Sequence, residues 1–240
     1  MMRLGIATAL WGRPHLTGRF LQYYAGLEVD GVELACVASV SPGDSEAPES
    51  APGWHLVEAP NSPLAAKFVR AIRSLRGQVD AVMVLGSDNF VSAAYIEEAC
   101  QMVRQGAGWV QPSALYVYEA DTGECAYVVA DKVGPGRVLS SRALDCCAWA
   151  PYPDADDYVN GNMDRLFDAL RGAYKADTGS VPRELFPMPI EVSAATGREL
   201  VDVKTKWNRW SYAHLASGGV AVDVRELQIA DVIRYIGHVR

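Results

Sequence analysis

The chain has 240 residues, of which 50% are hydrophobic and 21% are charged, which is enough apolar material for one sizeable core. Its formal net charge of −7 argues against a protein that coats nucleic acid through a basic face. No run approaches the roughly 20 apolar residues that a bilayer span requires, and no signal-peptide pattern is present, so we expect a soluble cytoplasmic protein without a membrane partner.

The first 105 residues alternate between two apolar patterns. Continuous apolar runs of strand length are followed by segments whose apolar residues recur at helical spacing. In chain order, the pattern predicts a strand at 4–10, a helix over 16–27, strands at 32–40 and 54–58, a helix at 64–75, a strand at 79–85 and a helix around 96–103. This alternation favours the α/β class, with a mostly parallel central sheet flanked by helices.

The pattern changes in the second half of the chain. Residues 114–131 alternate tyrosine and valine with small or polar residues around a turn, which predicts a β-hairpin. A helix is predicted at 156–170, short strands near 190 and at 200–203, and a terminal helix from 224 onward. We therefore expect one domain, 1–240, made of two halves, 1–112 and 113–240.

Polar residues follow three of the predicted parallel strands, at 8–13, 41–44 and 86–89. In an open parallel sheet, ligands bind beyond these carboxyl ends. Asp88 follows a buried strand, where its carboxylate and the Asn89 carbonyl would suit a phosphate-bound Mg²⁺ or Mn²⁺, because hard cations need oxygen ligands. The alternative is that Asp88 caps the next helix or closes a turn.

Four segments together resemble the first half of the GT-A glycosyltransferases. They are residues 8–14 (TALWGRP), 40–44 (VSPGD), 61–67 (NSPLAAK) and 85–89 (LGSDN). The resemblance implies a nucleotide-sugar site formed by Thr8, Leu10, Arg13, Asp44, Lys67, Ser87 and Asp88. Asp88 would be the main contact to the metal or the ribose. Lys67 would lie near the phosphates; the alternative is that Lys67 lies on a solvent-exposed helix face. Asn89 departs from the family pattern, in which a second carboxylate is common at this position.

In the second half, the same resemblance implies further roles. Asp164 stands where inverting members carry their catalytic carboxylate and is the expected general base, the alternative being a solvated helix carboxylate. Lys204 would pair with phosphate, and His214 would complete a metal shell with Asp88 and Asn89, although a lone histidine is more often structural. The acceptor side would include Trp149, Lys206 and Arg209.

The resemblance implies a metal-dependent transfer of a sugar from a nucleotide diphosphate sugar, with UDP as the expected nucleotide, to a hydroxyl acceptor. Residues 1–112 would bind the nucleotide sugar and residues 113–240 the acceptor. The segments at 160–164 and 202–212 resemble those of phage enzymes that modify hydroxymethylated bases in DNA, which the acidic charge fits poorly. Two alternatives stay open: a sugar-phosphate nucleotidyltransferase, disfavoured because residues 10–15 hold a single glycine, and a catalytically inert scaffold of the same fold.

Overall fold

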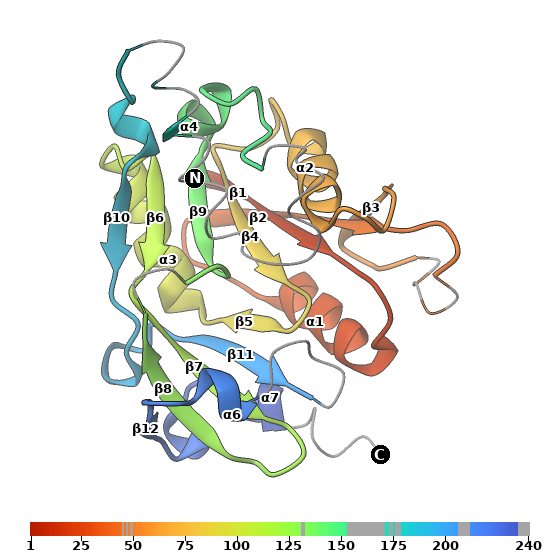
Figure 1. The fold of residues 1–240 in the computed structure, drawn as a ribbon, viewed down its shortest axis with the longest axis vertical. Helices are drawn as coiled ribbons and strands as arrows, with labels where there is room; N and C mark the ends of the chain where they lie inside the picture. The colour runs from red at the N-terminus through yellow and green to blue at the C-terminus, as the bar shows by residue number, and fades with distance from the viewer. Residues whose placement is uncertain are drawn as a thin grey trace.

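Two sheets and the helices packed on them make up the computed structural model, which describes residues 1–44, 46, 48, 50–130, 133–152, 171, 172, 175, 179–205 and 212–234 (Figure 1). The larger sheet has the strand order β10-β6-β9-β4-β1-β2-β3. Its strands are β1 (Met2–Ala9), β2 (Val32–Val40), β3 (Trp54–Glu58), β4 (Ala81–Gly86), β6 (Trp109–Pro112), β9 (Arg137–Ser140) and β10 (Pro187–Ile190). The strands β1 to β4 are parallel, whereas β9 runs antiparallel to its neighbours β4 and β6. The predicted mixed α/β class is confirmed, with one antiparallel strand that the sequence pattern does not reveal.

Helices cover both faces of the larger sheet. On one face, α1 (Pro14–Gly26) and α3 (Ala93–Arg104) pack on side chains such as Leu4 and Ile6. On the other, α2 (Leu64–Ser74) and α4 (Ser141–Asp145) pack on side chains such as Ala7. This division follows from the alternation of side chains along each strand. Among the described residues, no helix is long and apolar enough to cross a bilayer.

The smaller sheet joins segments that are distant in the sequence. Its order is β12 (Val220–Ala221), β8 (Cys125–Val129), β7 (Ala114–Glu119), β11 (Leu200–Lys204) and β5 (Asn89–Val91). The strands β7 and β8 form the predicted hairpin. Because β5 comes from residues 1–112 and pairs with β11, this sheet includes strands from both predicted halves. The division into the halves 1–112 and 113–240 therefore stays a prediction. Both halves contribute side chains to one hydrophobic core, and neither the core nor this sheet marks a boundary between them.

Short helices complete the described chain. They are η2 (Arg183–Leu185), η3 (Ala194–Thr196), α6 (Tyr212–Leu215), η4 (Val224–Glu226) and α7 (Ala230–Arg234). The terminal helix predicted from 224 is therefore wrong in its start, because a 3-10 turn capped by Asp223 precedes α7. The helix predicted at 156–170 lies outside the described residues.

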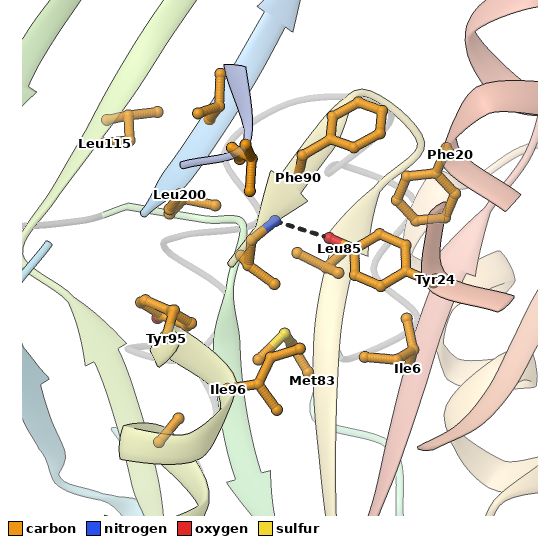
Figure 2. Packing of buried hydrophobic residues seen from close by; sticks show 14 of the residues in the cluster. Ile6, Phe20, Tyr24, Met83, Leu85, Phe90, Tyr95, Ile96, Leu115 and Leu200 are labelled. Atoms are coloured by element: carbon orange, nitrogen blue, oxygen red, sulfur yellow. Dashed lines mark hydrogen bonds between the residues drawn. The ribbon is translucent and has the colours of Figure 1, made fainter. Parts of the chain in front are cut away.

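An aromatic core supports the turn between β4 and β5 (Figure 2). The rings of Phe20 and Tyr24 on α1 lie 4.8 Å apart, and Phe20 also meets Phe90 of β5 at 6.0 Å. The Tyr24 hydroxyl accepts the Val91 N–H and donates to the Asn89 carbonyl, both at 3.0 Å. A buried aromatic side chain stabilises a fold by about 1.5–3 kcal/mol. The strand β5, which directly follows Asp88, is thus anchored on the core.

Candidate functional site

Three loops emerge side by side at the carboxyl ends of β1, β2 and β4. Because β1 pairs with both neighbours, Ala9 is level with Ser39 on one side and Gly86 on the other. The loop after β1, the turn after β2 and the turn between β4 and β5 therefore share one edge of the sheet. This is the edge at which open parallel sheets bind ligands.

The loop after β1 is fastened at two points. Asp44 Oδ2 accepts a hydrogen bond from the Gly12 N–H at 3.0 Å, and Lys67 Nζ donates to the Leu10 carbonyl. At the first of these points and directly after it, Gly12 and Arg13 have φ angles of 60° and 53°, in the left-handed region. For a residue other than glycine this conformation costs of order 1–3 kcal/mol and is concentrated at functional sites.

The Arg13 guanidinium spans the turn between β4 and β5. Its Nη1 donates to Asp88 Oδ2 and its Nη2 to Ser87 Oγ, each at 3.0 Å. Burial of the Asp88 carboxyl would raise its pKa, but the charges of Arg13 and Lys204 outweigh burial and hold the pKa below its ordinary value. Asp88 is thus a carboxylate at neutral pH with a matched positive charge beside it.

The helix-cap alternative for Asp88 is wrong, because Ser92 takes that position. Its side chain accepts a hydrogen bond from the Tyr95 N–H at the start of α3. The conformation of this turn also explains why position 86 is a glycine. A Cβ on Gly86 would lie only 2.6 Å from Asp88 Oδ1, so any other residue would force the Asp88 side chain to shift. Asp88 is therefore free of a capping role and points along the sheet edge toward the loop after β1.

A second carboxylate, Asp202 on β11, lies beside the first; it belongs to the segment 202–212 that the sequence singles out, but the sequence predicts no role for it in the site. Its Oδ2 is 2.6 Å from Lys204 Nζ, and its Oδ1 accepts a hydrogen bond from Asn89 Nδ2 at 3.1 Å. Burial raises the pKa of Asp202 to about 6, with the Lys204 charge opposing and the Asp88 charge adding to the rise. One signal in the sequence was available: Asp202 and Lys204 alternate with valines and so share one face of a strand.

Lys67 is fully buried, which makes the solvated-face alternative wrong. Its Nζ also donates to Asn61 Oδ1 at 3.3 Å and lies 5.6 Å from the ring centre of Trp11, whose indole is 46% exposed. Burial lowers the pKa of Lys67 to about 8, although the Asp44 charge opposes that shift. Lys67 therefore supports the site loop from beneath.

This lowered pKa gives a testable stability profile. The unfolded chain keeps the Lys67 proton up to its ordinary pKa of 10.5, whereas the folded chain loses it near 8. Between these values the unfolded state binds more protons, so the free energy of unfolding of the parent, minus that of Lys67→Met, should rise with pH by at most about 1.4 kcal/mol per unit. Urea unfolding from neutral to alkaline pH measures this difference. A flat or falling profile would contradict a depressed Lys67 pKa.

Two hydroxyl groups at the same edge have no hydrogen-bond partner within the described chain. Thr8 Oγ1 near the end of β1 and Ser41 Oγ just after β2 are both buried. A buried hydroxyl without a partner is costly, which points to an interaction that the described residues do not supply. The Leu10 side chain, also predicted for this site, is buried, so only its carbonyl is engaged there.

Of the three predicted metal ligands, Asp88 suits the role and Asn89 does not, while His214 stays a prediction. Asn89 Oδ1 accepts the Gly86 N–H at 2.7 Å and its carbonyl accepts the Tyr24 hydroxyl, so both oxygens are bonded within the fold. His214 is exposed on α6. Within the described ranges, no three His, Cys, Asp or Glu side chains are grouped to hold a metal. The described residues fit a divalent cation that is coordinated by Asp88 together with phosphate oxygens of a ligand. They do not fit a site in which three protein side chains coordinate the cation.

The remaining predicted residues divide into two groups. Trp149 is buried among apolar residues near α2 and α4, and its indole N–H donates to Asp145 Oδ1 at 2.8 Å. This placement favours a packing role over contact with an acceptor. Asp164, Lys206 and Arg209 lie outside the described residues.

Comparisons with known proteins bear on the fold. No protein-family model and no curated protein sequence matches the chain. The crystal structure of S. aureus TarS 1–349 in complex with UDP matches 85% of this chain with a TM-score of 0.52 and 8% identity, over 61% of the TarS chain. Another structure of TarS 1–349 matches with a TM-score of 0.46 and 10% sequence identity. The match covers 70% of this chain and 56% of the TarS chain. The 4-diphosphocytidyl-2C-methyl-D-erythritol synthase from Anaerococcus prevotii DSM 20548 matches with a TM-score of 0.46 and 11% sequence identity. That match covers 79% of this chain and 86% of the synthase chain.

These identities establish a likeness of fold alone. The chain spans little more than half the length of the TarS structures that it matches. Its mixed α/β architecture, a central sheet flanked by helices, is similar to GT-A glycosyltransferase structures, as the sequence predicts.

Proposed function

We propose that this protein transfers a sugar from a nucleotide diphosphate sugar, UDP-linked, to a hydroxyl group. The observation that carries the proposal is the cluster of Arg13, Ser87 and Asp88 at the carboxyl ends of β1 and β4. A guanidinium beside a carboxylate at this edge suits a charged, phosphate-bearing ligand. The UDP in the TarS crystal, bound to a protein of similar fold, supports uridine nucleotides as the first to test.

The described residues suggest how the nucleotide would be held. The unpartnered hydroxyls of Thr8 and Ser41 offer hydrogen bonds to a base or ribose, with Asp44 next to them on the turn after β2. Arg13 offers charge-assisted hydrogen bonds to the diphosphate. Lys204, proposed from the sequence for the same task, would first have to leave Asp202. A divalent cation at Asp88 would neutralise charge on the departing diphosphate.

The chemical step follows from this arrangement. The oxygen of the acceptor hydroxyl attacks the anomeric carbon while the bond from that carbon to the diphosphate oxygen breaks. The hydroxyl proton passes to a general base, for which Asp164 is our proposal from the sequence. The diphosphate carries the bonding electron pair away, and positive charge from Arg13 stabilises it as it departs.

The proposed acceptor is a hydroxymethylated pyrimidine in DNA, and one finding weakens it. A DNA acceptor would call for a basic surface, and Lys204, Lys206 and Arg209 are the densest basic cluster in the sequence. Lys204, however, is buried and paired with Asp202, so it contributes no exposed charge. Lys206 and Arg209 would have to supply phosphate contacts without it. Incubating duplex DNA that contains 5-hydroxymethylcytosine with UDP sugars, followed by mass analysis of its nucleosides, decides this part independently of the donor.

A melting experiment tests the proposed donor. UDP or a UDP sugar at about a hundredfold excess over its dissociation constant should stabilise the folded protein by about 2.7 kcal/mol, which is several degrees in melting temperature. Uridine without phosphates should give a much smaller shift. Consumption of a nucleoside triphosphate and a sugar phosphate with release of pyrophosphate would instead favour the nucleotidyltransferase. No shift with any nucleotide would refute the proposal.

A further inference from the structure

The Asp88 carboxylate is covered by a cation of the protein itself. Arg13 reaches it from a loop 75 residues away in the sequence and also binds the neighbouring Ser87 hydroxyl. The side chains of Arg13 and Asp88 keep 23% and 15% of their exposure, so the pair lies at the surface of the site and not deep in the core. A ligand arriving from solvent can therefore reach both partners.

The backbone of the loop that carries Arg13 is held by contacts that do not involve the Arg13 side chain. Asp44 holds the Gly12 N–H and Lys67 holds the Leu10 carbonyl, so the backbone on the strand side of Arg13 is tied to two other elements. Two guanidinium nitrogens are engaged within the described chain, which leaves further N–H groups for a ligand. Rotation of the Arg13 side chain would move its charge without rebuilding the loop.

The second carboxylate offers no substitute for Asp88. Asp202 Oδ2 is held by Lys204 at 2.6 Å, and Asn89 occupies Oδ1. A divalent cation arriving alone would thus meet two carboxylates that each already have a positive partner. A diphosphate arriving first would instead compete with Asp88 for the Arg13 guanidinium, because phosphate and carboxylate bind it in similar geometry.

We propose that Arg13 is a latch on Asp88: in the nucleotide-free protein it occupies the carboxylate, and a bound diphosphate draws it away and opens Asp88 to a divalent cation. The part of this proposal that involves nucleotide rests on the function proposed above. It requires positive coupling between nucleotide and cation, and by linkage the coupling is the same in both directions.

The test measures Mn²⁺ binding without turnover. Titrations followed by electron paramagnetic resonance give the affinity for Mn²⁺ alone and with UDP, for the parent and Arg13→Gln. In the parent, UDP should tighten Mn²⁺ binding by about tenfold or more. Arg13→Gln should bind Mn²⁺ alone about tenfold more tightly than the parent and lose most of the coupling, because its amide removes the guanidinium charge that lies 3.0 Å from Asp88.

Two further variants make the outcome decisive. Arg13→Lys keeps a positive charge near Asp88 and should bind Mn²⁺ alone as weakly as the parent. Arg70→Gln removes an exposed arginine from α2 and should change neither the affinity for Mn²⁺ alone nor the affinity for Mn²⁺ with UDP. If Arg13→Gln, shown to be folded by its urea transition, binds Mn²⁺ no more tightly than the parent, the latch is refuted. If the parent binds no UDP, the proposed function fails, yet the comparison with Mn²⁺ alone still decides whether Arg13 covers Asp88.

Discussion

Replacement of Asp202 by alanine is expected to lower the free energy of unfolding by about 3–5 kcal/mol. The carboxylate lies 2.6 Å from Lys204 Nζ, and the two side chains keep only 10% and 7% of their exposure. Removing one partner of a buried ion pair leaves the other charge desolvated and unmatched, which costs far more than the pair contributes. The Asn89 amide would lose its acceptor in the same variant. Urea denaturation, analysed for a change in midpoint at constant slope, measures the loss.

A double variant separates the lost pair from a general disturbance of β11. In Asp202→Leu with Lys204→Met, no buried charge stays without a partner, so much of the stability should return. The remaining deficit should be about 1–3 kcal/mol, from the Asn89 amide left without its acceptor. A double variant no more stable than Asp202→Ala would mean that the carboxylate is needed for its shape or its hydrogen bond to Asn89, and that the ion pair is secondary.

The first half of the fold is readable from the sequence because its signals are local. The strand 54–58 is found as predicted, and the helix predicted at 64–75 is α2. Parallel neighbours then bring the loop after β1 and the turn after β4 together, which is why Arg13 and Asp88 are close. The antiparallel strand β9 was missed because its four residues carry too little periodicity to reveal a direction.

The site was less predictable, because burial of polar residues depends on distant contacts. Lys67 lies on an amphipathic helix, where a lysine is usually solvated, yet it is buried under the Leu10 carbonyl. Asp202 lies 113 residues from Asn89, and only the smaller sheet brings them together. Asn89 was predicted as a metal ligand from its place beside Asp88. Its side chain instead turns back to the Gly86 N–H and closes the turn.

Replacing Asp88 by alanine is expected to abolish the effect of Mn²⁺ on nucleotide affinity and to lower the turnover of a nucleotide sugar by at least about a hundredfold, the usual cost of one group that stabilises developing charge. The fold should survive. The Asp88 carbonyl, which accepts the Val203 N–H at 2.8 Å, is unchanged by the substitution, and the side chain is partly exposed. Calorimetric titration with UDP in Mn²⁺ and in chelator measures the first effect, and release of UDP from a UDP sugar measures the second.

The matched control is Asp80→Ala, at the opposite end of the sheet. Asp80 immediately precedes β4 and its Oδ2 accepts the Arg3 N–H at 2.8 Å, so this variant also loses a carboxylate and one hydrogen bond. It should bind UDP as the parent does. Asp88→Ala also frees Arg13, so its affinity for UDP in chelator should equal or exceed that of the parent. An Asp88→Ala protein whose UDP affinity responds to Mn²⁺ like the parent would show that the cation binds elsewhere, and the assignment of Asp88 would have to be abandoned.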